Sequence, residues 1–334
     1  MRRIWLSAAS AALAVIWAAA PSAANDSLAE VAIGGLTLTT TDAISMDSED
    51  LYISRDEVKV DYRFTNATGK DIEALVAFPL PDQTSDPDTA VYNYESELKF
   101  KTVVDGKTVP FEIVEQAMVD GQDVTQRLKE LGLTPSGPAD WQAFEAQVKA
   151  LSPEQIKAAV SEGLLANMGA EEDPSYFAQW STRTTVTRKQ LFPAGKTISV
   201  QHSYRPLVGG SVGGNLNKEY RTEPWQREHA ADYCIEDSWF TAFDKQLASR
   251  ATEMNGSPYS EWWIGYVLSS GANWKGPIKD FRLVVDKGKP ENLLSFCAEG
   301  VKKIAPTQFE VRKSNFEPDK DLKILIVEWI DGQQ

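Results

Sequence analysis

The stretch that decides the fold is Val58–Pro81, VKVDYRFTNATGKDIEALVAFPLP. Apolar and polar residues alternate from 58 to 65, and the alternation resumes from 72 to 78 after a polar turn. A period of two predicts strands with one buried face and one wet face. Pro79 and Pro81 end the pattern because proline has no N–H to give to a ladder. The stretch therefore predicts a β-hairpin of defined register.

Similar alternation occurs before and after this stretch, but it is interrupted by a segment whose apolar residues have the spacing of a helix. Residues 25–116 and 178–208 have strand patterns, whereas 118–172 has apolar residues at helical spacing. We expect a first β unit over 25–216 with a helical insertion, and a second over 217–334 that begins with a helix at 238–250. The predicted class is mainly β with an α insertion: two antiparallel β-sandwich-like units plus the inserted helices.

The first 24 residues have the pattern of an export signal. Two arginines precede an apolar, alanine-rich run, and small residues lead up to Ala24. We predict cleavage between Ala24 and Asn25, after which a short polar segment leads into the first strand. A retained membrane anchor is the alternative, but the run is short and no basic flank follows it. No later apolar run reaches a membrane-spanning length, so we expect no transmembrane segment in the mature chain.

The chain is acidic. Its formal net charge of −14 becomes −16 when the predicted leader, which carries two arginines and no acids, is removed. Such a surface repels phosphate backbones and anionic lipids, which argues against nucleic-acid partners and polybasic membrane docking.

Cysteine occurs twice, at Cys234 and Cys297. In an exported chain an even pair predicts one disulfide, here between the segment before helix 238–250 and a strand of the second unit. A reactive redox pair is the alternative, and the absence of C-x-x-C spacing disfavours it.

Several distinctive segments are spread over the mature chain: NDSLAEVAIGGLTL, SEDLYIS, VDYRFTN with VAFPLPD, FPAGKTISVQHSYRP, GANWKGPIKDFRLVVDKG and NFEPDKDLKIL. In these segments the chain resembles a family of exported bacterial proteins known as a domain of unknown function, family 4424. The resemblance implies an envelope location and supplies no activity, cofactor or catalytic residue. A shorter segment, FTNATGKDIEALVAFPLP, resembles the hairpin of the vault/inter-alpha-trypsin domain.

One motif suggests a nucleophile. Residues 209–213, GGSVG, match G-x-S-x-G around Ser211, and His202 or His229 would be the base. A nucleophile elbow needs a helix immediately after the serine, and no apolar helix face follows here. We interpret the run as a flexible loop and keep a serine hydrolase as an alternative.

Metal sites have little support in the sequence. The chain has two histidines and no H-E-x-x-H, so we interpret His202 as a hydrogen-bonded structural residue. Asp82, Asp86 and Asp88 share one loop and could gather around calcium, but the loop lacks the glycine and distal glutamate of an EF-hand. We expect a solvated acidic loop, no metal and no cofactor.

Adjacent tryptophans, Trp262 and Trp263, fall within a strand pattern and must point to opposite faces. One can enter the core, and the other either binds a glycan or protein or lies under helix 238–250. The function that follows is a non-enzymatic periplasmic or cell-envelope β-scaffold that binds an envelope protein or other partner. A serine hydrolase and a calcium- or glycan-binding module are the alternatives.

Overall fold

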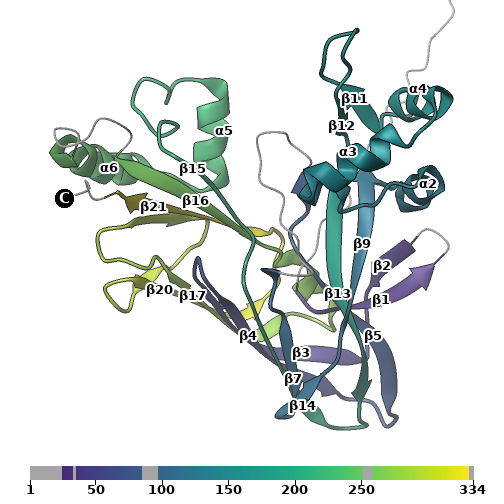
Figure 1. The fold of residues 1–334 in the computed structure, drawn as a ribbon. Helices are drawn as coiled ribbons and strands as arrows, with labels where there is room; N and C mark the ends of the chain where they lie inside the picture. The colour runs from purple at the N-terminus through teal and green to yellow at the C-terminus, as the bar shows by residue number, and fades with distance from the viewer. Residues whose placement is uncertain (1–24, 33–34, 85–96, 251–257, 331–334) are drawn as a thin grey trace, which may run out of the picture.

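The computed structural model describes residues 25–32, 35–84, 97–250 and 258–330. The predicted leader, including Ala24, and the candidate ligands Asp86 and Asp88 lie outside these ranges. The fold is mainly β with inserted helices, as predicted (Figure 1). No helix in the described ranges is long and apolar enough to cross a membrane.

The largest sheet has eight strands, and the predicted strand 58–65 lies near its middle. Val58, Val60, Tyr62 and Phe64 are at most 1% exposed, while the residues between them face solvent or are partly exposed. The order is β19 (Lys302–Lys303), β20 (Gln308–Phe316), β17 (Ile278–Asp286), β3 (Ile44–Ile53), β4 (Val58–Asn66), β14 (Thr197–Tyr204), β7 (Lys101–Val104) and β8 (Lys107–Val109).

Two further sheets contribute to the same hydrophobic core as the eight-stranded sheet. The seven-stranded sheet has the order β10 (Gln122–Asp123), β9 (Glu112–Val119), β13 (Ser181–Phe192), β5 (Ile72–Pro79), β1 (Ser27–Ala32) and β2 (Gly35–Thr39), with β6 (Gln83–Thr84) beside β13. The four-stranded sheet has the order β15 (Val208–Ser211), β16 (Tyr259–Tyr266), β21 (Leu322–Trp329) and β18 (Leu293–Phe296).

The predicted hairpin over Val58–Pro81 is wrong in its pairing, although both strands exist. β4 pairs with β3 and β14 in the large sheet, whereas β5 pairs with β1 and β13 in the seven-stranded sheet. The intervening turn carries the chain from one sheet to the other. Alternation reports which face of a strand is buried, and it is the same whether the next strand lies beside it or across the core. A five-residue connection, residues 67–71, permits either arrangement.

The expected boundary near residue 216 does not separate two sheets. β17 and β20 come from the expected second unit, yet β17 pairs with β3, in parallel, inside the large sheet. The main core likewise contains residues from both sides of the boundary, such as Phe78 and Ile324.

The helical insertion lies where the sequence predicts it and has a small core of its own, around Phe144 and Trp180. It comprises α2 (Thr125–Leu131), η1 (Gly137–Ala139), α3 (Trp141–Lys149), α4 (Pro153–Ser161) and a ribbon of β11 (Leu165–Asn167) with β12 (Tyr176–Ala178). In Figure 1 this group is at the opposite side of the view from α5 (Pro224–Asp232) and α6 (Asp237–Arg250).

The three large sheets meet at a buried polar group, which we call the hub: Asn25, Asp26, Arg188 and His202 with their partners. Asp26 accepts two hydrogen bonds from Arg188 of β13, at 3.2 and 2.7 Å, and contacts His202 Nε2 of β14 at 3.2 Å. Asn25 Oδ1 accepts from Tyr62 of β4 and Tyr266 of β16. The hub thus contacts all three sheets, and His202 is the structural histidine that the sequence predicts.

The charge of Asp26 in the hub is matched. Burial opposes ionisation of Asp26, but Arg188 and His202 outweigh it and hold the pKa of this carboxyl well below its usual range. Burial lowers the pKa of His202, which favours the neutral ring, and the other ring nitrogen lies 3.0 Å from Thr102 Oγ1. Asp26 and Arg188 therefore form a buried ion pair in which both carboxylate oxygens are hydrogen-bonded, while Arg188 Nε has no hydrogen-bond partner among the described residues.

We predict that Asp26→Asn lowers the free energy of unfolding by about 3–5 kcal/mol at pH 7, because it leaves Arg188 buried without its counter-charge. The folded-state pKa of Asp26 is below the unfolded value. The ion pair therefore stabilises the fold at pH values above the usual aspartate pKa of about 3.9, and this stabilisation is lost as the pH falls toward the folded-state pKa. Urea unfolding at pH values from 7 down to 3 measures this effect. The difference in the free energy of unfolding between wild type and variant should shrink as the pH falls. The exposed Asp42→Asn is the control; an equal effect at the two sites would contradict the prediction.

Candidate functional site

The four-stranded sheet has one face in the main core and the other under helices. On β16, Ile264 and Tyr266 enter the main core, whereas Tyr259 and Trp263 belong to a separate cluster with residues of α6. Glu261 lies between those two on the helix-covered face, as the alternation along a strand requires. This face carries the candidate site.

Helix α6 agrees with the predicted helix 238–250. Phe243 is fully buried, stacks on Trp239 with ring centroids 5.7 Å apart, and contacts Tyr259 and Trp329 of the sheet. The sequence analysis missed α5, because Gln226 is its one buried residue and the helix has no apolar stripe. Pro224 at its first position was the available signal.

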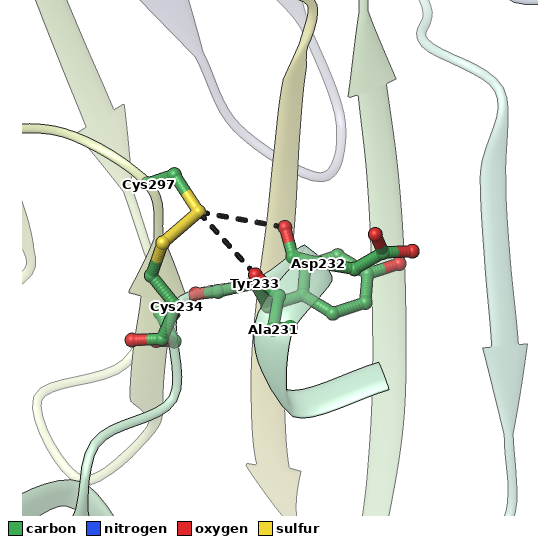
Figure 2. The surroundings of a disulfide bond; sticks show 6 residues. Ala231, Asp232, Tyr233, Cys234 and Cys297 are labelled. Carbon is green, nitrogen blue, oxygen red and sulfur yellow. Dashed lines mark hydrogen bonds between the residues drawn. A yellow bond between two sulfur atoms is a disulfide. The ribbon is translucent and has the colours of Figure 1, made fainter. Parts of the chain in front are cut away.

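A disulfide holds the end of α5 against the sheet (Figure 2). The predicted bond between Cys234 and Cys297 is present, with Cα atoms 5.1 Å apart. Cys234 lies two residues after the end of α5, and Cys297 directly follows β18. The sulfur of Cys297 lies 3.7 Å from the carbonyl oxygen of Ala231 and 3.6 Å from that of Asp232, in the last turn of α5. Both cysteines are exposed, so reductant can reach the bond.

Four buried or partly buried polar side chains of α5 and β16 form a group that we call the Glu261 cluster: Gln226, His229, Glu261 and Trp263. The Nε2 atom of His229 lies 3.5 Å from Glu261 Oε2, and the imidazole lies 6.0 Å from a ring of Trp263. Gln226 precedes His229 by three residues on α5 and so shares its face. Glu261 is 0% exposed and Gln226 is 1% exposed.

The cluster has polar atoms without partners. Within the described ranges, nine buried side-chain polar atoms have no hydrogen-bond partner, and six of them belong to these four residues. Each such group lowers the free energy of unfolding by about 1–3 kcal/mol when it has no hydrogen-bond partner. Together they would cost as much as the whole free energy of unfolding of a typical domain. The six are Gln226 Nε2 and Oε1, His229 Nε2, Glu261 Oε1 and Oε2, and Trp263 Nε1.

The charge of Glu261 is also unmatched. Apart from His229, no basic side chain of the described residues lies within 4.0 Å of its carboxylate. Its field acts on the neighbouring tyrosines: burial first and Glu261 in addition raise the pKa of Tyr259 to about 12, although hydrogen bonds with the backbone oppose the shift. The cluster can therefore accept a partner that brings positive charge and hydrogen-bonding groups.

Ser211, the candidate nucleophile, lies beside this cluster. It ends β15, and the strand register places it directly opposite Glu261. The predicted flexible loop is thus a strand up to Ser211, and turns rather than a helix follow it. No hydrogen bond joins Ser211 to His229 or His202 in the part of the chain that the structure describes, and His202 lies in another sheet. The arrangement lacks the geometry of a nucleophile elbow.

The remaining candidates lie apart from the cluster. Asp82 forms a two-bond ion pair with Arg183, at 3.1 and 2.9 Å, so its carboxylate has a partner. No group of three or more potential metal-ligating histidine, cysteine, aspartate or glutamate residues occurs among the described residues. Trp262 packs on the edge of the main core, donates to Glu328 at 3.1 Å and lies under the guanidinium of Arg55. Trp263 lies under the helices.

Comparison with known proteins gives the family. A family model described as a domain of unknown function, DUF4424, matches residues 24–325. The chain belongs to this family. No curated protein matches the DUF4424 chain. Among solved structures, it is similar to one described as a putative nutrient binding protein from Legionella pneumophila, at 13% sequence identity and a TM-score of 0.45. That match covers 91% of this chain and 70% of the other.

We predict that replacing both cysteines by alanine destabilises this DUF4424 chain by on the order of 4 kcal/mol, because the bond closes a loop between residues 63 positions apart. Urea unfolding with and without reductant measures the effect. Reductant should lower the midpoint of the wild type toward that of the double variant and leave the double variant unchanged. A wild-type midpoint that is insensitive to reductant, with the thiols shown to be free, would contradict the prediction.

Proposed function

We propose that this DUF4424 protein is a non-enzymatic, exported β-scaffold of the periplasm or cell envelope that binds a small cationic, polar ligand at the Glu261 cluster. One observation carries the proposal: Glu261 is fully buried, and neither oxygen of its carboxylate has a hydrogen-bond partner among the described residues. An ionised group in such a position is strongly unfavourable unless it is paired.

The chemistry of the cluster defines the ligand class. Glu261 calls for a positive group, Trp263 Nε1 offers a hydrogen bond to an acceptor, and the amide of Gln226 can both donate and accept. A hydrated metal cation and a small amine with hydroxyl or carbonyl groups share this chemistry. Ordered water alone could satisfy the neutral atoms but would leave the charge of Glu261 unmatched.

The scaffold around the cluster is preorganised. The disulfide fixes the end of α5, which carries Gln226 and His229, onto the sheet that carries Glu261. Holding the two walls in place before binding reduces the ordering cost of association. The leader-like first residues and the disulfide support export, since such bonds persist in oxidising compartments.

The serine hydrolase alternative has one supporting feature, the register that places Ser211 opposite Glu261. Catalysis would need the serine hydroxyl within hydrogen-bond reach of the base, and an oxyanion site next to it. The absence of a contact between Ser211 and His229 in the described residues favours the binding function.

Native mass spectrometry of the protein, purified from the envelope fraction of cells that export it, tests the proposal. We expect one adduct per wild-type chain, whose mass distinguishes a metal ion from an organic amine. Glu261→Gln should lose the adduct because it removes the charge, and Glu228→Gln, at an exposed position of α5, should retain it. A wild-type chain without an adduct would contradict the proposal, as would fluorophosphonate labelling that Ser211→Ala abolishes.

A further inference from the structure

The first described residues are polar and fully buried. Asn25, Asp26 and Ser27 are each 0% exposed, although they lie at the predicted start of the mature chain. Polar residues at a chain end ordinarily lie in solvent. Burial of three in succession indicates that the interior is built to receive them.

The pocket matches the side chain of Asn25 atom by atom. Its Oδ1 accepts hydrogen bonds from Tyr62 at 2.8 Å and Tyr266 at 2.9 Å. Its Nδ2 donates to Glu49 Oε2 at 3.0 Å and to the carbonyl oxygen of Leu268 at 3.2 Å. All four hydrogen-bonding positions of the amide are therefore used.

The backbone at this point is held as closely, by the short helix η2 (Ser269–Asn273) and the residue after it. The Asn25 nitrogen donates to Ser270 Oγ, and that hydroxyl donates to the Asn25 carbonyl oxygen at 2.6 Å. Trp274 Nε1 donates to the carbonyl oxygen of Asp26. A Cβ atom added at Gly271 would lie 2.6 Å from Asn25 Nδ2. The helix η2 can therefore approach Asn25 this closely only because residue 271 is glycine.

One buried carboxylate next to Asn25, that of Glu49, has no cationic partner among the described residues. Arg188 balances Asp26, whereas Glu49 pairs with no lysine, arginine or histidine of the described residues. Burial raises the pKa of Glu49 to about 8, although hydrogen bonds from Asn25 and Tyr266 oppose the shift. The interior around Asn25 therefore has a place for one more positive charge.

We propose that cleavage after Ala24 creates this charge: the α-ammonium of Asn25 is a buried counter-ion of Glu49, and the processed N-terminus completes the core. Hydrolysis of the Ala24–Asn25 bond consumes one water, leaves a carboxylate on Ala24 and an amine on Asn25, and the amine takes up a proton. The family match beginning at residue 24 agrees with this position. The new group has three donors in place of one; Ser270 already accepts from this nitrogen, and Glu49 accepts from the side chain of the same residue.

Cleavage after Ala24 is then a step in the folding of the protein. In a chain that keeps residues before Asn25, the nitrogen is a neutral amide and Glu49 has no counter-charge. Such a chain must also lead out of a fully buried position. The precursor should therefore be less stable than the mature protein, and the difference should depend on Glu49.

The test compares two chains made from the same cleavable fusion, one starting at Asn25 and one retaining Gly-Ser before it. Each is made as wild type, Glu49→Gln and the exposed control Glu73→Gln. We expect the extension to lower the melting temperature by at least about 3 °C in wild type and Glu73→Gln, and by clearly less in Glu49→Gln.

Equal melting temperatures with and without the extension would overturn the proposal. An equal loss in wild type and Glu49→Gln would also overturn it, because the extension would then act through its bulk alone. As an independent check, N-terminal sequencing of the protein exported through its own leader should begin at Asn25. Any other first residue would overturn the proposal even if all the purified variants fold.

Discussion

The buried ion pair between Asp26 and Arg188 is the interaction on which the arrangement of the sheets depends. Arg188 comes from β13 of the seven-stranded sheet, and His202 from β14 of the large sheet contacts the same carboxylate. The preceding residue, Asn25, joins Tyr62 of the large sheet to Tyr266 of the four-stranded sheet. Apolar packing among these sheets is strong but tolerant of shifts, whereas buried charges require partners at fixed positions. The hub thus specifies how the three sheets are placed relative to one another.

Each of the two histidines of the chain lies against a buried carboxylate, and the two sites differ in how completely they are satisfied. At Asp26, Arg188 supplies the charge and the hydrogen bonds. At Glu261, His229 is the one basic neighbour in the described ranges and both carboxylate oxygens lack hydrogen bonds. Strand β16 connects the sites, because Tyr266 faces the hub and Glu261 faces the helices. This contrast between the two buried acids is the basis of the binding function proposed for Glu261.

The features that could be predicted from sequence are those that local chemistry determines. The alternation at 58–65 identifies β4, and the apolar residues at helical spacing in 118–172 identify the inserted helices. The disulfide was predicted from two cysteines in a chain that is expected to be exported. Pairing was not predictable in the same way: β4 and β5 have the alternation of a hairpin yet belong to different sheets, and the same holds for β13 and β14. Asn25 and Asp26 resemble a polar chain end, and partners that lie 24 to 248 positions away in the sequence make them interior. The Glu261 cluster was missed because α5 has no apolar stripe and because a glutamate in a strand is ordinarily read as exposed.

Hydrogen exchange, measured on peptides from β4, β13 and β16, tests the role of the hub most directly. The comparison is between wild type and Arg188→Met, which keeps much of the side-chain volume and leaves Asp26 buried without its cation. If the hub holds the three sheets together, protection should fall in all three peptides, including those of the two sheets that do not contain residue 188. Loss of protection confined to β13 and its immediate neighbours would contradict that role.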